Sequence, residues 1–271
     1  MTGLARLEAA FSAAKAAGRC ALVPYLCAGD PDAETTRAVL AAIGPFSDAI
    51  ELGVPYGDPL ADGPVIAAAA QRALEAKMNL DGVFALVREA VRNEAPPIVL
   101  FSYLNPVVQY GIERFAGELV ASGACGAIVP DVPLEEIGEL RAAFAARALA
   151  LPLLVAPTTP LARAERIAEG SDAFVYLVSR LGVTGTRREP DFAWIAERVT
   201  ALRRASGKAV AVGFGIATPE HVRRIAALAD GAIVGSALVE AYAGTRGDEA
   251  AERAHAFVRL LATAAQGGPG P

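Results

Sequence analysis

Eight short apolar runs alternate along the chain with longer segments of helical period, and this alternation constrains the fold more than any other feature. The runs are Ala21–Leu26, Ala49–Leu52, Ile98–Phe101, Ala127–Val129, Leu153–Val155, Phe174–Val178, Ala209–Val212 and Ala232–Val234. Such short and almost wholly apolar runs are typical of parallel strands that helices cover on both faces. The pattern predicts an α/β fold, a single (β/α)8 TIM barrel, with a doubly wound open sheet as the alternative.

Two helical segments extend this pattern beyond the plain eightfold alternation. Gly3–Ala17 precedes the first strand and is expected to cover the lower end of the barrel. The widest gap, between the second and third strands, contains Val65–Ala76 and Gly82–Arg92. We therefore expect an extra N-terminal helix and an extra helix between strands 2 and 3.

Three polar residues stand where helices are expected to begin. Asp81, Thr159 and Thr218 each come just before a segment of helical period. Their side-chain oxygens are expected to accept N–H groups of the first helical turn, which have no partner within the helix.

The composition fits one folded domain. Of the 271 residues, 54% are hydrophobic and 20% are charged, which excludes a largely disordered chain. Barrels of this class often use about 250 residues as one domain, so we expect a catalytic domain over 1–265 and a disordered tail over 266–271. The net charge of −5, without a basic cluster, argues against nucleic-acid binding.

Neither a membrane span nor a secretory signal is expected. The uncharged stretch 95–112 contains three prolines, an asparagine and a glutamine, which would break a spanning helix or leave polar groups unpaired in lipid. The first 17 residues include both charges and lack an uninterrupted apolar region. We therefore predict a cytoplasmic protein.

Cysteine and histidine offer little material for a metal site. Cys20, Cys27 and Cys125 are an odd number without a CxxC spacing, which favours buried thiols in a reducing compartment. The only histidines, His221 and His255, lie far apart in sequence. No metal site and no histidine-based catalytic triad is predicted.

Glu51 is the first candidate for chemistry, because it lies inside a strand that is otherwise apolar. Alternation places Ile50 and Leu52 on one side of the strand and Glu51 on the other. If the two apolar residues face the helices, the carboxylate points into the barrel mouth, where burial would raise its pKa toward the range of acid–base catalysis. The alternative is a strand-end glutamate paired with a nearby arginine.

The long loop after this strand supplies a second carboxylate. It contains three prolines and two glycines between Val54 and Pro64, which indicates a shaped functional loop. Asp62 is either a second site carboxylate or the cap of the helix that begins near Pro64. The residues alone leave both roles open.

Glycines at two later strand ends predict a phosphate site. Gly213, Phe214 and Gly215 end the seventh strand, and Gly235 and Ser236 end the eighth just before a helix. Glycines allow backbone N–H groups to approach a phosphate, and a helix N-terminus adds a partial positive charge. Phosphate sites in this fold frequently use these two loops.

Other candidates are less specific. The segment 180–186, which includes Thr184 and Gly185, is either a mobile lid over the ligand or an ordinary surface turn. Tyr176 in the sixth strand and Tyr103 after the third are core or rim aromatics, or substrate contacts.

Motifs spread over nearly the whole chain resemble the tryptophan synthase alpha subunit family. In order along the chain they are 51–55 (ELGVP), 58–64 (DPLADGP), 105–107 (NPV), 109–111 (QYG), 128–131 (IVPD), 156–160 (APTTP), 176–180 (YLVSR), 182–185 (GVTG), 212–215 (VGFG) and 234–237 (VGSA). The resemblance implies a single barrel that cleaves indole-3-glycerol phosphate by a retro-aldol reaction, giving indole and glyceraldehyde 3-phosphate.

The resemblance also implies roles for particular residues. Glu51 would be the catalytic acid/base and Asp62 the carboxylate at the indole nitrogen. Tyr176 would lie near the glycerol chain, with Tyr103 as a further substrate contact. The implied contacts around the phosphate and the substrate are Thr184, Gly185, Gly213, Phe214, Gly215, Gly235 and Ser236.

A beta subunit carrying pyridoxal phosphate is the partner implied by the resemblance, in an α2β2 complex, while this chain itself needs no cofactor. The partner face would include 56–62, Asn105 and 131–133. Gly57, at a position that is commonly serine, and the run 65–69 depart from the family pattern near this face. These departures leave a stand-alone lyase that releases indole as an alternative. An inactive barrel that only activates its partner is the non-enzymatic alternative, against which Glu51, Asp62 and Tyr176 argue. Another phosphate-binding barrel, such as a sugar-phosphate isomerase, would not need the spacing of Glu51 and Asp62.

Overall fold

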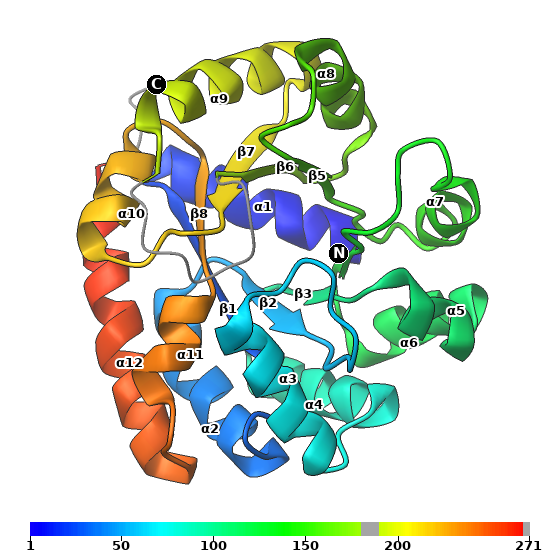
Figure 1. The fold of residues 1–271 in the computed structure, drawn as a ribbon, viewed down its shortest axis with the longest axis vertical. Coiled ribbons are helices and arrows are strands. Elements are labelled where there is room, and N and C mark those ends of the chain that lie inside the picture. The colour runs from blue at the N-terminus through cyan, green and yellow to red at the C-terminus, as the bar shows by residue number, and fades with distance from the viewer. Residues whose placement is uncertain (180–189, 268–271) are drawn as a thin grey trace.

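The computed structural model describes residues 1–179 and 190–267, and in this part of the chain eight parallel strands form a barrel (Figure 1). The strands are β1 Ala21–Cys27, β2 Ile50–Gly53, β3 Ile98–Phe101, β4 Gly126–Ile128, β5 Leu153–Val155, β6 Phe174–Val178, β7 Ala209–Gly213 and β8 Gly231–Val234. Each matches a predicted run, with bounds shifted by at most one residue. The predicted strands are confirmed.

The order of the strands shows that the sheet closes on itself. Neighbouring strands pair in the order β4-β3-β2-β1-β8-β7-β6-β5. The two ends of this order meet at a parallel bridge between Gly126 and Ala150, just before β5. The barrel is therefore confirmed, and the open doubly wound sheet is wrong.

Helices surround the barrel and cover its lower end. They are α1 Gly3–Ala16, α2 Ala33–Ile43, α3 Pro64–Glu75, α4 Leu80–Arg92, α5 Leu104–Tyr110, α6 Ile112–Ser122, α7 Gly138–Ala145, α8 Leu161–Gly170, α9 Phe192–Ser206, α10 Pro219–Ala226, α11 Ser236–Tyr242 and α12 Gly247–Ala264, with a 3-10 turn η1 Gly44–Phe46. The extra helix α1 and the pair α3 and α4 between β2 and β3 are confirmed. The helix expected directly after β8 is present as α11, whereas the short helix α5 was not predicted.

The three predicted helix caps have different outcomes. Thr218 caps α10, because its hydroxyl accepts the N–H of the third helical residue. Asp81 is not the cap of α4, because that helix begins at Leu80, two residues before the predicted Gly82, and the side chain of Asn79 accepts the N–H of Gly82 instead. Thr159 does not cap α8 either, because its hydroxyl turns back to accept the N–H of Ala156.

The apolar residues form two layers, one inside the barrel and one between the strands and the helices. The helix α1 closes the N-terminal end of the inner layer: the Phe11 ring stacks on Phe174, the first residue of β6, with 4.9 Å between ring centroids. This end is therefore packed with side chains. A site for small molecules belongs at the opposite end, where the strands finish.

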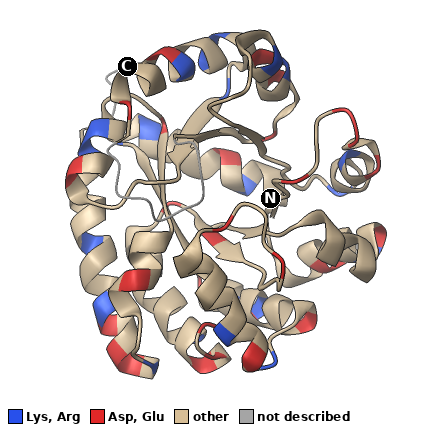
Figure 2. Cartoon of the chain, in the orientation of Figure 1, with Lys and Arg blue, Asp and Glu red and all other residues tan. Residues whose placement is uncertain are grey.

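Charged residues are concentrated on the outer helices, and the strands are almost free of them (Figure 2). None of the helices in the described ranges is long and apolar enough to cross a bilayer. A carboxylate within a strand is consequently an exception to the charge pattern of the whole fold.

Candidate active site

Glu51 lies inside the barrel with only 2% of its surface exposed. It occupies β2, where Ile50 and Leu52 pack in the outer layer toward the helices, as the alternation predicts. Burial, and then the charge of Asp62, raise the pKa of Glu51 to about 8. Its buried Oε2 has no hydrogen-bond partner among the described residues, so this oxygen is free to meet a ligand.

Asp62 is held next to Glu51 by the hydroxyl of Tyr103. The residue does not cap α3, because Gly63 is the N-cap and provides no side chain. Instead its carboxylate accepts a hydrogen bond from Tyr103, whose oxygen also accepts the N–H of Ala61 at 3.0 Å. Burial raises the pKa of Asp62 to about 6, although the Tyr103 hydrogen bond opposes this increase.

The two carboxylates therefore have different protonation states near neutral pH. With a pKa of about 8, Glu51 is mostly protonated at pH 7, whereas Asp62, with a pKa of about 6, is mostly ionised. Neighbouring carboxyl groups whose environments separate their pKa values are suited to act as an acid and a base in one reaction. The barrel mouth thus holds one proton donor and one anion.

Tyr176 reaches the carboxylates from β6, on the opposite side of the mouth. The charges of both Glu51 and Asp62 add to the effect of burial in raising its pKa, so its hydroxyl stays protonated. Its ring contacts Phe214 edge to face, at 5.9 Å between centroids. A Cβ at Gly213 would collide with the Tyr176 hydroxyl, which explains glycine at this strand end.

The predicted phosphate loops lie side by side, since β7 pairs with β8. Phe214 and Gly215 both adopt positive φ angles, of 65° and 89°, in the tight turn after β7. Gly235 precedes α11, whose first turn begins at Ser236 and offers N–H groups that lack partners within the helix. This edge of the mouth is suited to an anion.

Two predicted residues cannot be placed. Thr184 and Gly185, together with the predicted lid, lie outside the described residues. The last four residues of the predicted tail, 268–271, lie outside them as well.

One residue of the mouth was missed by the sequence reasoning. Tyr25 lies in β1 directly beside Glu51, as its Cα partner in the neighbouring strand. The alternation within β1 could have revealed it, because Val23 and Tyr25 share the inner layer whereas Leu22 and Leu26 share the outer one.

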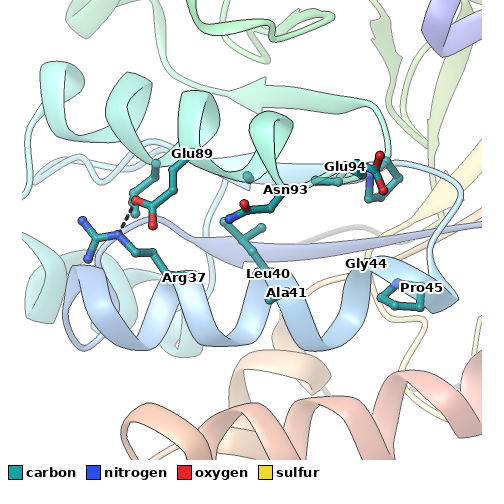
Figure 3. A pocket seen from close by; sticks show the side chains of 12 residues that line it. Arg37, Leu40, Ala41, Gly44, Pro45, Glu89, Asn93 and Glu94 are labelled. Atoms are coloured by element: carbon teal, nitrogen blue, oxygen red, sulfur yellow. Dashed lines mark hydrogen bonds and ion pairs between the residues drawn. The ribbon is translucent and has the colours of Figure 1, made fainter.

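A separate hollow lies on the outside of the barrel, between α2 and α4 (Figure 3). Its volume is about 410 Å³, and its floor includes Leu40 and Leu86. At its rim the Glu89 carboxylate is paired with Arg37 at 2.7 Å. The two acids of this hollow, Glu89 and Glu94, are both exposed, so we assign the chemistry to the buried carboxyl pair of the barrel mouth.

The fold and the buried carboxyl pair define a (β/α)8-barrel enzyme with a candidate acid/base site at the carboxyl ends of the strands. Residues 11–266 match the family model described as tryptophan synthase alpha chain. The chain belongs to the tryptophan synthase alpha chain family, and the predicted resemblance is confirmed.

Individual relatives agree with this assignment. The tryptophan synthase alpha chain of Synechocystis sp. is 48% identical over 264 residues, covering 95% of this chain and 98% of the relative. That of Arabidopsis thaliana is 45% identical over 240 residues, covering 86% of each. A solved structure of Mycobacterium tuberculosis tryptophan synthase superposes with a TM-score of 0.88 at 36% identity, covering 96% of this chain and 98% of the other.

Proposed function

We propose that the chain cleaves indole-3-glycerol phosphate into indole and glyceraldehyde 3-phosphate, as the alpha subunit of a tryptophan synthase. The observation that carries the proposal is the pair of carboxyl groups in the barrel mouth, the buried Glu51 and its neighbour Asp62, whose pKa values burial raises to about 8 and about 6. Carbon–carbon cleavage of this kind is a lyase reaction that needs a proton donor, then a proton acceptor, and an anion near the ring that becomes positive.

In this reaction Glu51 moves two protons. Its carboxyl group donates a proton to C3 of the indole, which makes the ring able to accept the electrons of the bond to the glycerol chain. As that bond breaks, the adjacent hydroxyl becomes an aldehyde, and the Glu51 carboxylate accepts the hydroxyl proton. Glu51 is thereby restored, and each transfer contributes typically about 10²–10⁴-fold.

Asp62 stabilises the charge that this protonation creates. The protonated ring spreads positive charge onto the indole nitrogen, where an ionised carboxylate lowers its energy. Tyr103 holds that carboxylate in place through its hydroxyl. Tyr176, on the opposite wall, faces the glycerol chain.

The phosphate anchors the substrate without taking part in the chemistry. Gly213, Phe214 and Gly215 supply one side of this site, and Gly235 and Ser236 supply the other. We keep Thr184 and Gly185 in the site as a prediction. Binding energy from this end holds C3 against Glu51, which raises the rate through orientation.

We further propose that the chain works in the cytoplasm in an α2β2 complex with a beta subunit, which carries pyridoxal phosphate. The face that supports this lies at the same end of the barrel as the site. There the Tyr56 hydroxyl accepts a hydrogen bond from Asn105 at 3.1 Å, and Asp131 accepts the N–H of Leu104 at 2.9 Å. Leu60, in the loop 56–62 of the proposed face, is exposed. The chemistry in this chain requires neither metal nor cofactor.

The test is indole release from indole-3-glycerol phosphate by the purified chain, with and without a beta subunit. Glu51→Gln should abolish release but leave the affinity for glycerol 3-phosphate, measured by calorimetry, largely unchanged. Glu197→Gln, on the exposed face of α9, is the control. Comparable turnover in Glu51→Gln would exclude the acid/base role. Full turnover without the partner would favour the stand-alone lyase, and no turnover with it would favour the inactive activator.

A further inference from the structure

Two tyrosines inside the barrel each place the hydroxyl over a glycine of the neighbouring strand, and the two pairs have the same strand register. Tyr176 leans from β6 across β7, and its hydroxyl lies over Gly213. Tyr25 leans from β1 across β2, and its hydroxyl lies over Gly53. In both cases the glycine comes two residues after the tyrosine's Cα partner, which for Tyr25 is Glu51. The two hydroxyls therefore enter the mouth in equivalent positions from two different walls.

The position of Tyr25 is fixed on several sides. Its ring meets Phe101 edge to face at 6.2 Å between centroids, and a Cβ at Gly235 would lie 3.4 Å from its ring carbon Cδ1. At Gly53 a Cβ would lie 2.6 Å from the ring carbon Cζ and would collide with the hydroxyl. With 6% of its surface exposed, Tyr25 has little freedom to turn.

The hydroxyl lies in the field of both site carboxylates. Burial raises the pKa of Tyr25 most, and the charges of Cys27, Asp62, Glu51 and Tyr242 add to the increase. The group therefore remains a protonated hydrogen-bond donor throughout the neutral range. No hydrogen bond joins it to another described residue, although a hydroxyl in an apolar wall is unfavourable unless a partner meets it.

We infer that Tyr25 is a catalytic residue whose hydroxyl donates a hydrogen bond to the substrate oxygen that becomes the aldehyde, next to Glu51. This inference rests on the proposed function. It gives a role to a hydroxyl at a position where a phenyl ring would fill the wall equally well. A donor at that position stabilises the oxygen as it transfers its proton and gains electron density.

The test compares Tyr25→Phe with the wild-type chain in the indole-release assay with a beta subunit. The variant keeps the ring, so we expect kcat/KM to fall about tenfold, the worth of one hydrogen bond. Its affinity for indole-3-propanol phosphate, which lacks both glycerol hydroxyls, should stay within about twofold, since that ligand offers no oxygen to Tyr25. Unchanged kcat/KM, or an equal loss of affinity for the analogue, would overturn the inference.

Gly53→Ala provides an independent arm, because its Cβ displaces the Tyr25 hydroxyl. The loss of turnover caused by Gly53→Ala should be smaller in the Tyr25→Phe background, where the hydroxyl is already absent; multiplicative losses would contradict the inference. Gly117→Ala is the matched control, because a Cβ there meets nothing within 4 Å. A wild-type chain that releases no indole would refute the proposed function instead. An active wild-type chain together with unchanged kcat/KM in Tyr25→Phe would refute the Tyr25 inference alone.

Discussion

Replacing Glu51 by glutamine should change the pH dependence of stability as well as activity. In the unfolded chain this carboxyl group titrates near 4.5, whereas in the folded protein its pKa is about 8. Between these values the folded state holds a proton that the unfolded state has lost. The free energy of unfolding therefore falls as the pH rises from 4.5 through 8, because above this range the folded protein must hold an ionised Glu51.

The size of the effect follows from the difference between the two pKa values. With about 1.4 kcal/mol per unit, a difference of 8 − 4.5 = 3.5 units corresponds to about 5 kcal/mol at pH 9. Because only 2% of Glu51 is exposed, solvent screening reduces this little. Glutamine has nearly the same shape and does not titrate, so Glu51→Gln should remove the loss.

Urea unfolding of both proteins at pH 5, 7 and 9 measures this directly. The free energy of unfolding of Glu51→Gln minus that of the wild type should become more positive by several kcal/mol between pH 5 and pH 9. A constant offset from the new amide does not alter this slope, and Asp62 is present in both proteins. Equal differences at the three pH values would refute the buried-acid reasoning, and Glu197→Gln should show no such trend.

Three further predictions concern the support of the site and the barrel floor. Tyr103→Phe removes a hydrogen bond that lowers the pKa of Asp62, so that pKa should rise above about 6. The acidic limb of the kcat/KM profile, measured from pH 5 to 9, should then move to higher pH. An acidic limb at the same pH in both proteins would contradict this. Ser236→Glu places negative charge at the proposed phosphate site and should raise KM at least about tenfold, whereas Ser236→Ala should not; unchanged KM would exclude the site. Phe11→Ala removes a buried ring from the barrel floor and should lower the free energy of unfolding in urea by about 3–5 kcal/mol; a loss below about 1 kcal/mol would show that α1 is not needed there.

The strands and their order could be predicted because their signal is local. Each strand is a short apolar run, and burial on both faces leaves little choice in its composition. The first residues of the helices were harder to predict, because several residues that can cap a helix occur within one turn of one another. Asn79 and Asp81 are both good capping residues, and the structure uses Asn79.

The residues of the proposed site could be selected from the sequence, but the contacts between them could not. Glu51 could be recognised from alternation alone, since a carboxylate breaks an apolar strand. The hydrogen bond from Tyr103 to Asp62 joins residues 41 positions apart, which no local pattern specifies. Tyr25 was overlooked because an aromatic residue in an apolar run is ordinary. Its proposed role follows from β2, the neighbouring strand, which places Glu51 opposite it.

The seam between β4 and β5 shows how narrowly the ring of strands is completed. The backbone there comes so near that any carbon attached to Gly126 would collide with the carbonyl oxygen of Ala150, and the φ angle of 155° at this glycine disfavours a side chain as well. A side chain at residue 126 would push β4 away from the segment that leads into β5. The cylinder is closed because residue 126 carries a hydrogen atom where every other amino acid carries carbon.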